Sequence, residues 1–249
     1  MGFLALIYGV ISYVLFFAAF LYIIVFVGGD ALPLDMFAKT IDAGTSPLSW
    51  APAVLVNIGL LMLFGLQHTI MARQGFKKAM TKIIPWSIER STYVLLTAII
   101  LFAIYTYWVP MPGVVWSITS PAWSMFMLAL FFVGIGIVLL STFLIDHFEL
   151  FGLSQVWHRF KGKELPKPEF RTPLFYKNVR HPLYLGWIIF FWATPHMTVG
   201  HLVFASVWTI YIFVAIGYEE RDLTRLFGDR YRNYVAKVPM IIPFGKSKD

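Results

Sequence analysis

The segment YKNVRHPLYLGW, residues 176–187, places a cation and an imidazole directly before a long apolar run. Pro182 lacks a backbone N–H and has a φ angle suited to a first helical turn, so we expect a helix to begin there. Arg180 and His181 then lie at the helix N-terminus, where unpaired N–H groups and the helix dipole attract a carboxylate or a phosphate. The same side chains could instead act only as a topology anchor at the membrane edge, and these residues alone leave both interpretations open.

A second group of charges, Glu219 and Glu220, follows the last apolar run. These carboxylates could pair with Arg180 or Arg221, or they could belong to a solvated helix end. Apolar residues repeat at helical spacing after them, which predicts that the helix continues toward Gly228. This glycine is suited to end the helix, and we expect a further helical turn beyond it.

The elements that position these groups are predicted from composition. The 249 residues are 59% hydrophobic and 13% charged, whereas an ordinary soluble domain has about 25% charged residues. This high hydrophobic and low charged content indicates an integral membrane protein, in which each membrane span takes about 20 residues. Six apolar runs cover residues 3–27, 52–71, 92–109, 121–145, 183–199 and 201–217. We therefore expect an all-α, polytopic transmembrane helical bundle of about six membrane helices, followed by a cytoplasmic C-terminal helical segment.

The last two runs form one stretch, residues 183–217, that contains no Asp, Glu, Lys or Arg. As a helix with a rise of ~1.5 Å per residue, this stretch would be about 52 Å long, which is enough for two short spans. Pro195 and Gly200 interrupt the stretch, so we expect a tight helical hairpin.

The positive charges lie almost entirely on one side of the predicted spans. Of the 20 Lys and Arg residues, 19 fall in the segments 72–91, 146–182 and 218–249. The positive-inside rule then places these segments and both termini in the cytoplasm. The net charge of +7 follows from this topology signal, so nucleic acid is not expected as a partner. We expect one integral membrane domain over residues 1–249, in which residues 1–109 form the N-terminal helices.

The C-terminal motifs resemble those of a known family. RHPLYLG, followed by EERDLTRLFGDRYRNYVAKVPMIIP, is similar to the C-terminal signature of isoprenylcysteine carboxyl methyltransferases and bacterial phospholipid methyltransferases. These are integral membrane enzymes that use S-adenosylmethionine (SAM), so the resemblance implies a SAM-binding part at about residues 121–243. The positions that match the Gly-x-Gly and Glu-Glu groups associated with SAM are Gly134, Gly136, Glu219 and Glu220. The residues that match the other motif, which we also expect to bind the cofactor, are Arg180, His181, Pro182, Tyr184 and Gly186. The two glycines of the Gly-x-Gly pair are a weak signal by themselves, since glycine also serves helix packing in membranes.

The upstream half narrows the resemblance. LFGLQHTIMARQGFKK, PWSIERSTYVLL and LLSTFLIDHFELFGLSQVW look like segments of the bacterial methanethiol S-methyltransferase group, which is related to the NnrU-like membrane proteins. The similarity then extends over most of residues 60–243. It implies methyl transfer from SAM to a small thiol, methanethiol, giving dimethyl sulfide. It also implies a place in the inner membrane of a bacterium, with lipids around the spans.

The chemical groups of SAM are compatible with these residues. Arg180 and the helix N-terminus are suited to its carboxylate, and Glu219 or Glu220 to its ammonium or its ribose hydroxyls. Aromatic faces are suited to the adenine and to the cationic sulfonium. The tyrosines expected there are Tyr184, Tyr231 and Tyr234. Methyl transfer needs the two reactants held in line and does not need a metal.

A thiol reacts as its thiolate, so a base is expected beside the acceptor. One candidate is His147 in STFLIDHFEL, because imidazole titrates near neutrality. Thr142, Asp146 and Glu149 have the i, i+4, i+7 spacing of one helical face. We therefore expect a carboxylate, Asp146, to orient the imidazole, and Thr142 and Glu149 to contact the substrate.

The second candidate base is His68, which lies with Gln67 near the cytoplasmic end of the second span. Polar side chains at such a depth usually face the interior of the bundle, so Gln67 is expected to bind the substrate. Either histidine could instead serve only the end of its helix. The spacing of His68, His147 and His181 matches no compact metal-ligand pattern, so no metal site is expected. Arg90 is expected to pair with acidic groups on the cytoplasmic side, and it could also reach the cofactor.

Other activities are compatible with parts of this pattern. The acceptor could be a lipid or an isoprenylcysteine-type thiol, which would need a lateral opening between helices. A sterol-type reductase has a similar C-terminal hairpin, but the chain has no glycine-rich nucleotide-binding signature. Outside enzymes, the alternatives are a non-catalytic NnrU-like accessory protein and a small transporter. The spans carry almost none of the charged residues that transporters use.

Overall fold

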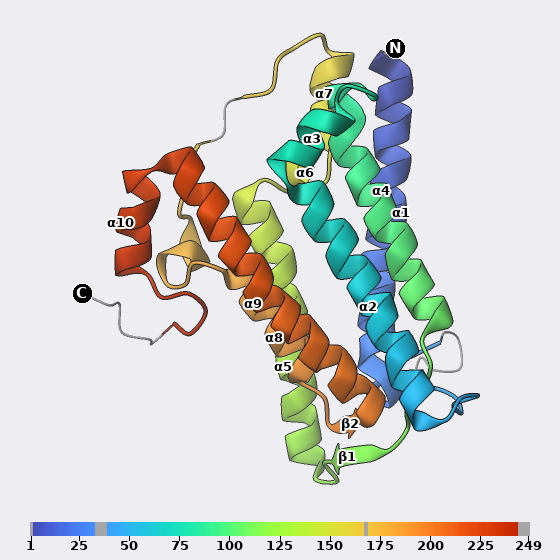
Figure 1. Ribbon diagram of the computed structural model, residues 1–249. Helices are drawn as coiled ribbons and strands as arrows, with labels where there is room; N and C mark the ends of the chain where they lie inside the picture. Colours follow the sequence, from blue (N-terminus) through green and yellow to red (C-terminus); the bar gives the residue numbers. More distant parts are fainter. Residues whose placement is uncertain (1, 33–38, 167–168, 244–249) are drawn as a thin grey trace.

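The computed structural model describes residues 2–32, 39–166 and 169–243. The long helices are α1 (Gly2–Gly28), α2 (Trp50–Ala72), α4 (Trp86–Tyr107), α5 (Pro121–Ile145) and α9 (Val199–Phe227) (Figure 1). Each of these helices is long and apolar enough to cross a membrane. The predicted class, a polytopic helical membrane protein, is therefore confirmed.

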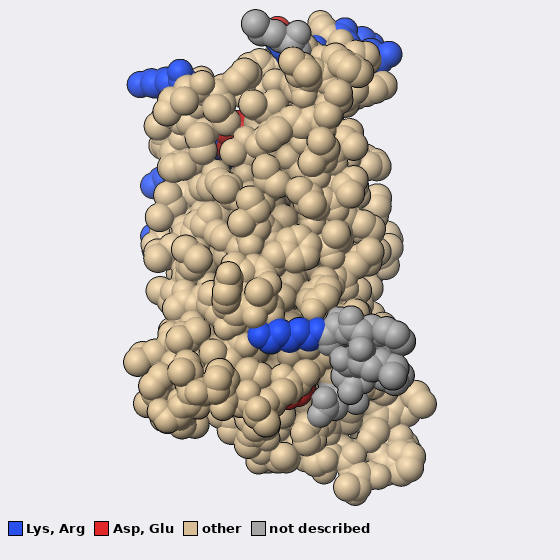
Figure 2. Space-filling view, turned by 90° about the vertical axis from the view of Figure 1, so that its right-hand side faces the viewer, with Lys and Arg blue, Asp and Glu red and all other residues tan. Residues whose placement is uncertain are grey.

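The cation-rich segments share one end of the bundle. The shorter elements include η1 (Gly29–Ala31), α3 (Gln74–Met80), α6 (His147–Leu150), α7 (Leu153–Phe160), η2 (Leu174–Lys177) and α10 (Asp229–Lys237). α3, α6 and α7 lie at the end that holds the N-terminus (Figure 1). Lys and Arg atoms gather at the same end on the face shown in Figure 2, and most of the surface below them is uncharged. Three of the cations counted above, Lys167, Lys246 and Lys248, lie outside the described residues.

The helices form two groups. In the first group, α1 packs on α4 and α7, and α2 packs on α4. In the second group, α5 packs closely on α8 (Pro182–Trp192), which also contacts α9. The two groups meet where α2 packs on α9 and where the rings of Phe26, Trp108, Phe191 and Phe204 contact one another at centroid distances of 5.3–6.1 Å. This aromatic junction fixes the groups relative to each other, because large rings bury much apolar area.

The fifth apolar run is not a full span. α8 has 11 residues, so it is about 16 Å long, roughly half of the ~30 Å hydrocarbon core. Residues 193–198 connect it to α9 and complete the predicted hairpin. Pro195 lies in this connection, as predicted. Gly200 lies inside the first turn of α9, so the prediction that it breaks the helix was wrong.

A small sheet, which the sequence analysis did not predict, forms at the opposite end from α3. β1 (Val114–Ser117) pairs antiparallel with β2 (His196–Thr198). The indole N–H of Trp116 also donates to the carbonyl oxygen of Thr194, at 3.1 Å. Non-helical backbone close to lipid needs hydrogen-bond partners, and the sheet supplies them to the connection between α8 and α9.

Two glycines allow α5 and α8 to approach closely. A Cβ atom at Gly134 would lie 2.6 Å from the backbone nitrogen of Phe190, and one at Gly186 would lie 2.7 Å from the carbonyl oxygen of Gly134. Real Cβ contacts are longer, so the crossing requires glycine at both positions. Gly134 and Gly186 were predicted to bind the cofactor, and the structure shows both of them at this helix crossing. Gly136 makes no such contact.

We expect Gly134→Ala to push α5 away from α8 and to destabilise the protein by about 1–3 kcal/mol, the usual effect of overpacking. Gly136→Ala is the matched control, because nothing lies within 4 Å of a Cβ atom at that position. Thermal unfolding in detergent should give a lower Tm for Gly134→Ala and a nearly unchanged Tm for Gly136→Ala. Equal Tm values for the two variants would contradict this account of the crossing.

Candidate functional site

A cavity of about 290 Å³ lies between the two helix groups. Its N-terminal wall comes from α1, α2 and α4 and includes His68, Arg90 and Tyr93. Its C-terminal wall comes from α5, α8 and α9 and includes Tyr184 and Glu219. Most of the other lining side chains are apolar or aromatic. A largely apolar cavity with a few convergent polar groups is the usual form of a small-molecule site, so we take this cavity as the candidate active site.

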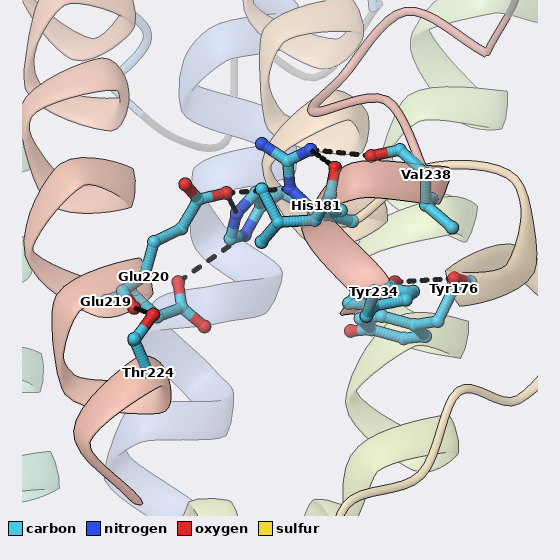
Figure 3. A network of polar contacts seen from close by, with 9 residues as sticks. Tyr176, His181, Glu219, Glu220, Thr224, Tyr234 and Val238 are labelled. Atoms are coloured by element: carbon cyan, nitrogen blue, oxygen red, sulfur yellow. Dashed lines mark hydrogen bonds and ion pairs between the residues drawn. The ribbon is translucent and has the colours of Figure 1, made fainter. Parts of the chain in front are cut away.

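The segment before α8 is held by the end of the described chain. The backbone N–H groups of Arg180 and His181 donate to the carbonyl oxygens of Pro239 and Met240, at 2.9 and 3.1 Å. Pro182 is the first residue of α8, as predicted. These bonds hold Arg180 and His181 beside α9, where both side chains contact Glu220 (Figure 3).

Glu220 is engaged by two neighbours through one of its carboxylate oxygens. Its Oε1 accepts hydrogen bonds from Arg180 Nε at 2.8 Å and from His181 Nε2 at 2.9 Å (Figure 3). The Nη1 of Arg180 donates to the carbonyl oxygens of Val235 and Val238. The Arg180 side chain is only 9% exposed, so its charge depends on these partners. This network connects α8, α9 and α10, and Glu220 is not among the residues that line the cavity.

Glu219 is in the opposite situation. It lines the cavity, and its Oε2 is buried without a hydrogen bond from any described residue. The Nδ1 of His181 lies 3.7 Å from that oxygen, and 41% of the Glu219 side chain is exposed. A buried oxygen without a partner costs free energy, so this carboxylate is suited to a cationic ligand group. Of the two predicted glutamates, Glu219 is the one available to a ligand.

The three predicted tyrosines occupy two places. Tyr184 lines the cavity from α8. Tyr231 and Tyr234, on α10, pack against Phe170, and the Tyr234 hydroxyl donates to the carbonyl oxygen of Tyr176 (Figure 3). Burial raises the pKa of Tyr234 to about 12, so the hydroxyl keeps the proton that it donates. Tyr176, which the sequence analysis missed, lines the cavity, and the bond from Tyr234 holds its loop.

The helix expected to carry Thr142, Asp146 and Glu149 on one face is broken. α5 ends at Ile145, and Asp146 is the N-cap of α6, where its Oδ1 accepts from the backbone N–H of Glu149 at 2.9 Å. No hydrogen bond joins Asp146 to the ring of His147 within the described residues. The prediction that Asp146 orients this imidazole was wrong, because aspartate at this position starts a new helix.

His147 is buried and held by two hydroxyl groups. Its Nε2 lies 2.8 Å from Tyr13 Oη, and its Nδ1 lies 2.9 Å from Thr142 Oγ1. Thr142 donates its proton to the carbonyl oxygen of Leu139 at 2.7 Å. It therefore accepts from Nδ1–H of His147, and Nε2 accepts from Tyr13. Both nitrogens of a neutral ring are thus used, and Thr142, rather than His147, lines the cavity.

His68 lies in the cavity wall with its nitrogens free. Its Nδ1 is buried, and neither ring nitrogen forms a hydrogen bond in the described part of the chain. The ring stacks on Phe64 and contacts Tyr93, at centroid distances of 5.1 and 5.0 Å. Such an imidazole is suited to proton transfer with a small molecule. Gln67 instead donates to the carbonyl oxygen of Tyr93 at 3.5 Å, so it contacts α4 and is not among the lining residues.

Arg90 also lines the cavity, from the second turn of α4. Its Cζ lies 5.5 Å from the centre of the Tyr93 ring. Within residues 2–32, 39–166 and 169–243 it forms no ion pair, so the prediction that it pairs with acidic groups was wrong. The spacing of an arginine in an apolar helix does not tell which neighbour its side chain meets. In the same ranges, no three His, Asp or Glu side chains gather as possible metal ligands.

Comparison with known proteins gives close relatives. The chain is 50% identical over 245 residues to methanethiol S-methyltransferase 1 of Bradyrhizobium diazoefficiens, which covers 98% of this chain and 84% of the relative. It is 48% identical over 243 residues to the methanethiol S-methyltransferase of Mycobacterium tuberculosis, with 97% of each chain covered. Nurim of Xenopus laevis is more distant, at 30% identity over 74% of this chain and 70% of its own. No family model and no solved structure matches the chain.

Burial lowers the pKa of His147 below its ordinary value of 6.5. At pH values just below 6.5 the unfolded chain therefore binds a proton that the folded protein does not, so stability is lost as the pH falls through this range. We expect the Tm in detergent to decrease from pH 6.5 to about 5, and to decrease less in His147→Gln. His158→Gln is the control, because among the described residues the ring of this histidine hydrogen-bonds only to the Ser154 carbonyl of its own helix. An equally steep decrease in His147→Gln and wild type would show that His147 does not carry this dependence.

Proposed function

Because the chain belongs to the methanethiol S-methyltransferase family, we propose that it transfers a methyl group from SAM to methanethiol, giving dimethyl sulfide and S-adenosylhomocysteine. The observation that carries this proposal is the arrangement of the cavity. An unpartnered carboxylate oxygen, Glu219 Oε2, and an imidazole without hydrogen bonds, His68, lie on opposite walls. The first is suited to a cationic methyl donor and the second to a thiol that must lose its proton.

The cavity residues are compatible with SAM. Glu219 would hold the ammonium group of the donor, and the rings of Tyr184 and Trp187 on the same wall would face its cationic sulfur. When bound, SAM supplies a methyl group activated by a positively charged sulfur. Arg180 lines the cavity with its Nε and Nη1 already donating, and its network with Glu220 keeps His181, and with it the start of α8, in place.

His68 is the proposed base. It accepts the proton as the S–H bond of methanethiol breaks, and the sulfur lone pair then forms the new bond to the methyl carbon while the bond from that carbon to the donor sulfur breaks. The proton leaves from His68 to water at the cation-rich end of the cavity. Phe16, Phe20 and Phe191 line the cavity and exclude water from the reacting atoms. Holding the two sulfurs in line with the methyl group supplies much of the rate enhancement.

The cavity size favours a small acceptor. Its volume of about 290 Å³ lies at the lower limit of the ~300–1,000 Å³ that is usual for sites of drug-sized ligands. A donor and methanethiol would occupy this space, and a lipid or prenyl tail would need additional volume. The C-terminal wall is built within residues 121–243, which supports the proposal that this part binds SAM. The cation-rich end supports an orientation in a bacterial inner membrane with both termini in the cytoplasm.

The direct test uses the purified protein in detergent with methanethiol and SAM that carries a trideuterated methyl group. We expect trideuterated dimethyl sulfide in the headspace, measured by gas chromatography with mass detection, and none when either reactant is omitted. Binding of S-adenosylhomocysteine, measured by calorimetry, is followed in parallel. Binding without dimethyl sulfide would overturn methanethiol as the acceptor and direct the search to lipid and prenyl thiols. No binding and no product would overturn the methyltransferase proposal and favour an accessory role.

His68→Gln should lower kcat by roughly 100-fold or more, the usual contribution of a general base, with little change in the Kd of S-adenosylhomocysteine. The deficit should shrink as the pH rises, because more methanethiol is then ionised without help. His147→Gln is the matched control, since its ring nitrogens are already occupied by Tyr13 and Thr142. A large loss of kcat in His147→Gln together with a normal rate in His68→Gln would transfer the role of base to His147.

A further inference from the structure

The mechanism above leaves one charged group of the cavity without a role. Arg90 is half-buried in the wall, and it has neither an ion pair nor a hydrogen bond within the described residues. A guanidinium stays charged at every physiological pH, so its position beside apolar side chains costs free energy unless an anion binds there. The face of Tyr93, 5.5 Å from its Cζ, offsets part of this cost and leaves the N–H groups free.

The neighbouring arginines differ in this respect. Arg180 also lines the cavity, but its Nε and Nη1 already donate to Glu220 and to two backbone carbonyl oxygens. Arg73, at the end of α2, pairs with Asp222 at 3.1 Å and does not line the cavity. Of these three arginines, Arg90 is therefore the one whose N–H groups have no hydrogen-bond acceptor among the described residues.

The opposite wall carries the complementary group. Glu219 projects from α9, and its buried Oε2 lacks a hydrogen-bond partner. Arg90 projects from α4, and in the described structure the two side chains do not pair with each other. A ligand with an ammonium and a carboxylate on one carbon would satisfy both residues at once. We infer that Arg90 binds the α-carboxylate of the methyl donor while Glu219 binds its α-ammonium, so that the amino-acid end of the donor bridges the two walls. This inference rests on the proposed function.

A carboxylate suits Arg90 better than the thiolate of the acceptor does. The planar guanidinium offers two parallel N–H groups, which match the two oxygens of a carboxylate. Arg90 lies only one turn inside α4, and the start of α4 is near α3 and α6 (Figure 1). The deeper lining, which includes Ile23 and Leu101, is apolar and suits the small thiol. Arg180 then has a supporting role, rather than the contact to the carboxylate that the sequence analysis assigned to it.

The test compares two probes on the full-length protein in lipid nanodiscs. S-Adenosylhomocysteine carries the amino-acid end, whereas 5′-methylthioadenosine keeps the adenosine and the thioether but lacks that end. In Arg90→Gln we expect the Kd of S-adenosylhomocysteine to rise about 10- to 100-fold, as for a lost charge-assisted pair. The Kd of 5′-methylthioadenosine should stay within about twofold of wild type. Arg90→Lys should give an intermediate loss, because lysine keeps the charge without the two parallel donors.

Arg73→Gln is the matched control, and it should leave both Kd values within about twofold, since Arg73 pairs outside the cavity. Unchanged S-adenosylhomocysteine binding in Arg90→Gln would overturn the inference, and a raised KM for methanethiol in that variant would assign Arg90 to the thiolate. An equal loss for both probes would also overturn it, as a general distortion of the cavity. If the wild-type protein bound neither probe, the proposed function itself would fail, which is a separate result.

Discussion

The ion pair between Arg180 and Glu220, which is largely shielded from solvent, is the interaction on which the C-terminal half of the protein depends. Arg180 reaches the glutamate on α9 and the carbonyl oxygens that end α10, while its own backbone bonds the chain near Pro239. A charge this deep is tolerated only when its partners are present, so the three helices that it joins are fixed together. The close crossing of α8 on α5, which requires Gly134 and Gly186, extends this fixed unit to the cavity wall.

Glu219 owes its availability to its neighbour. Adjacent residues on a helix point about 100° apart, so Glu220 faces Arg180 and His181 while Glu219 faces the cavity. Glu220 takes up the nearby donors, and the buried oxygen of Glu219 is left without one. One carboxylate thus stabilises the scaffold, and the other stays able to bind a cation. The two histidines differ in the same way. Both ring nitrogens of His147 are hydrogen-bonded to hydroxyl groups, whereas those of His68 have no hydrogen bond in the described structure.

Much of the fold could be predicted from the sequence, because hydrophobic runs, the proline at the start of α8 and the glycine after α9 are local signals. The short length of α8 could not be predicted in this way. The two-stranded sheet could not be predicted either, since strands of three and four residues have almost no recognisable sequence pattern. The site was harder to predict. Helical spacing placed Thr142 and Glu149 on one face, but Asp146 ends that helix. The partner of His147, Tyr13, is 134 residues away, and no spacing rule connects them.

The cavity also separates charge in a way that suits the proposed reaction. Of its two arginines, Arg180 is already paired with Glu220, whereas Arg90, on the N-terminal wall, is uncommitted. The carboxylate oxygen without a hydrogen bond, Glu219 Oε2, is on the C-terminal wall, and most of the remaining lining is apolar. A cationic sulfur and a thiolate react to give neutral products, so charge disappears as the new bond forms. An apolar surrounding raises the energy of the charged reactants more than that of the less charged transition state. Charged anchors at the rim can therefore hold the donor without solvating the reacting atoms, which accounts for a site built between membrane helices.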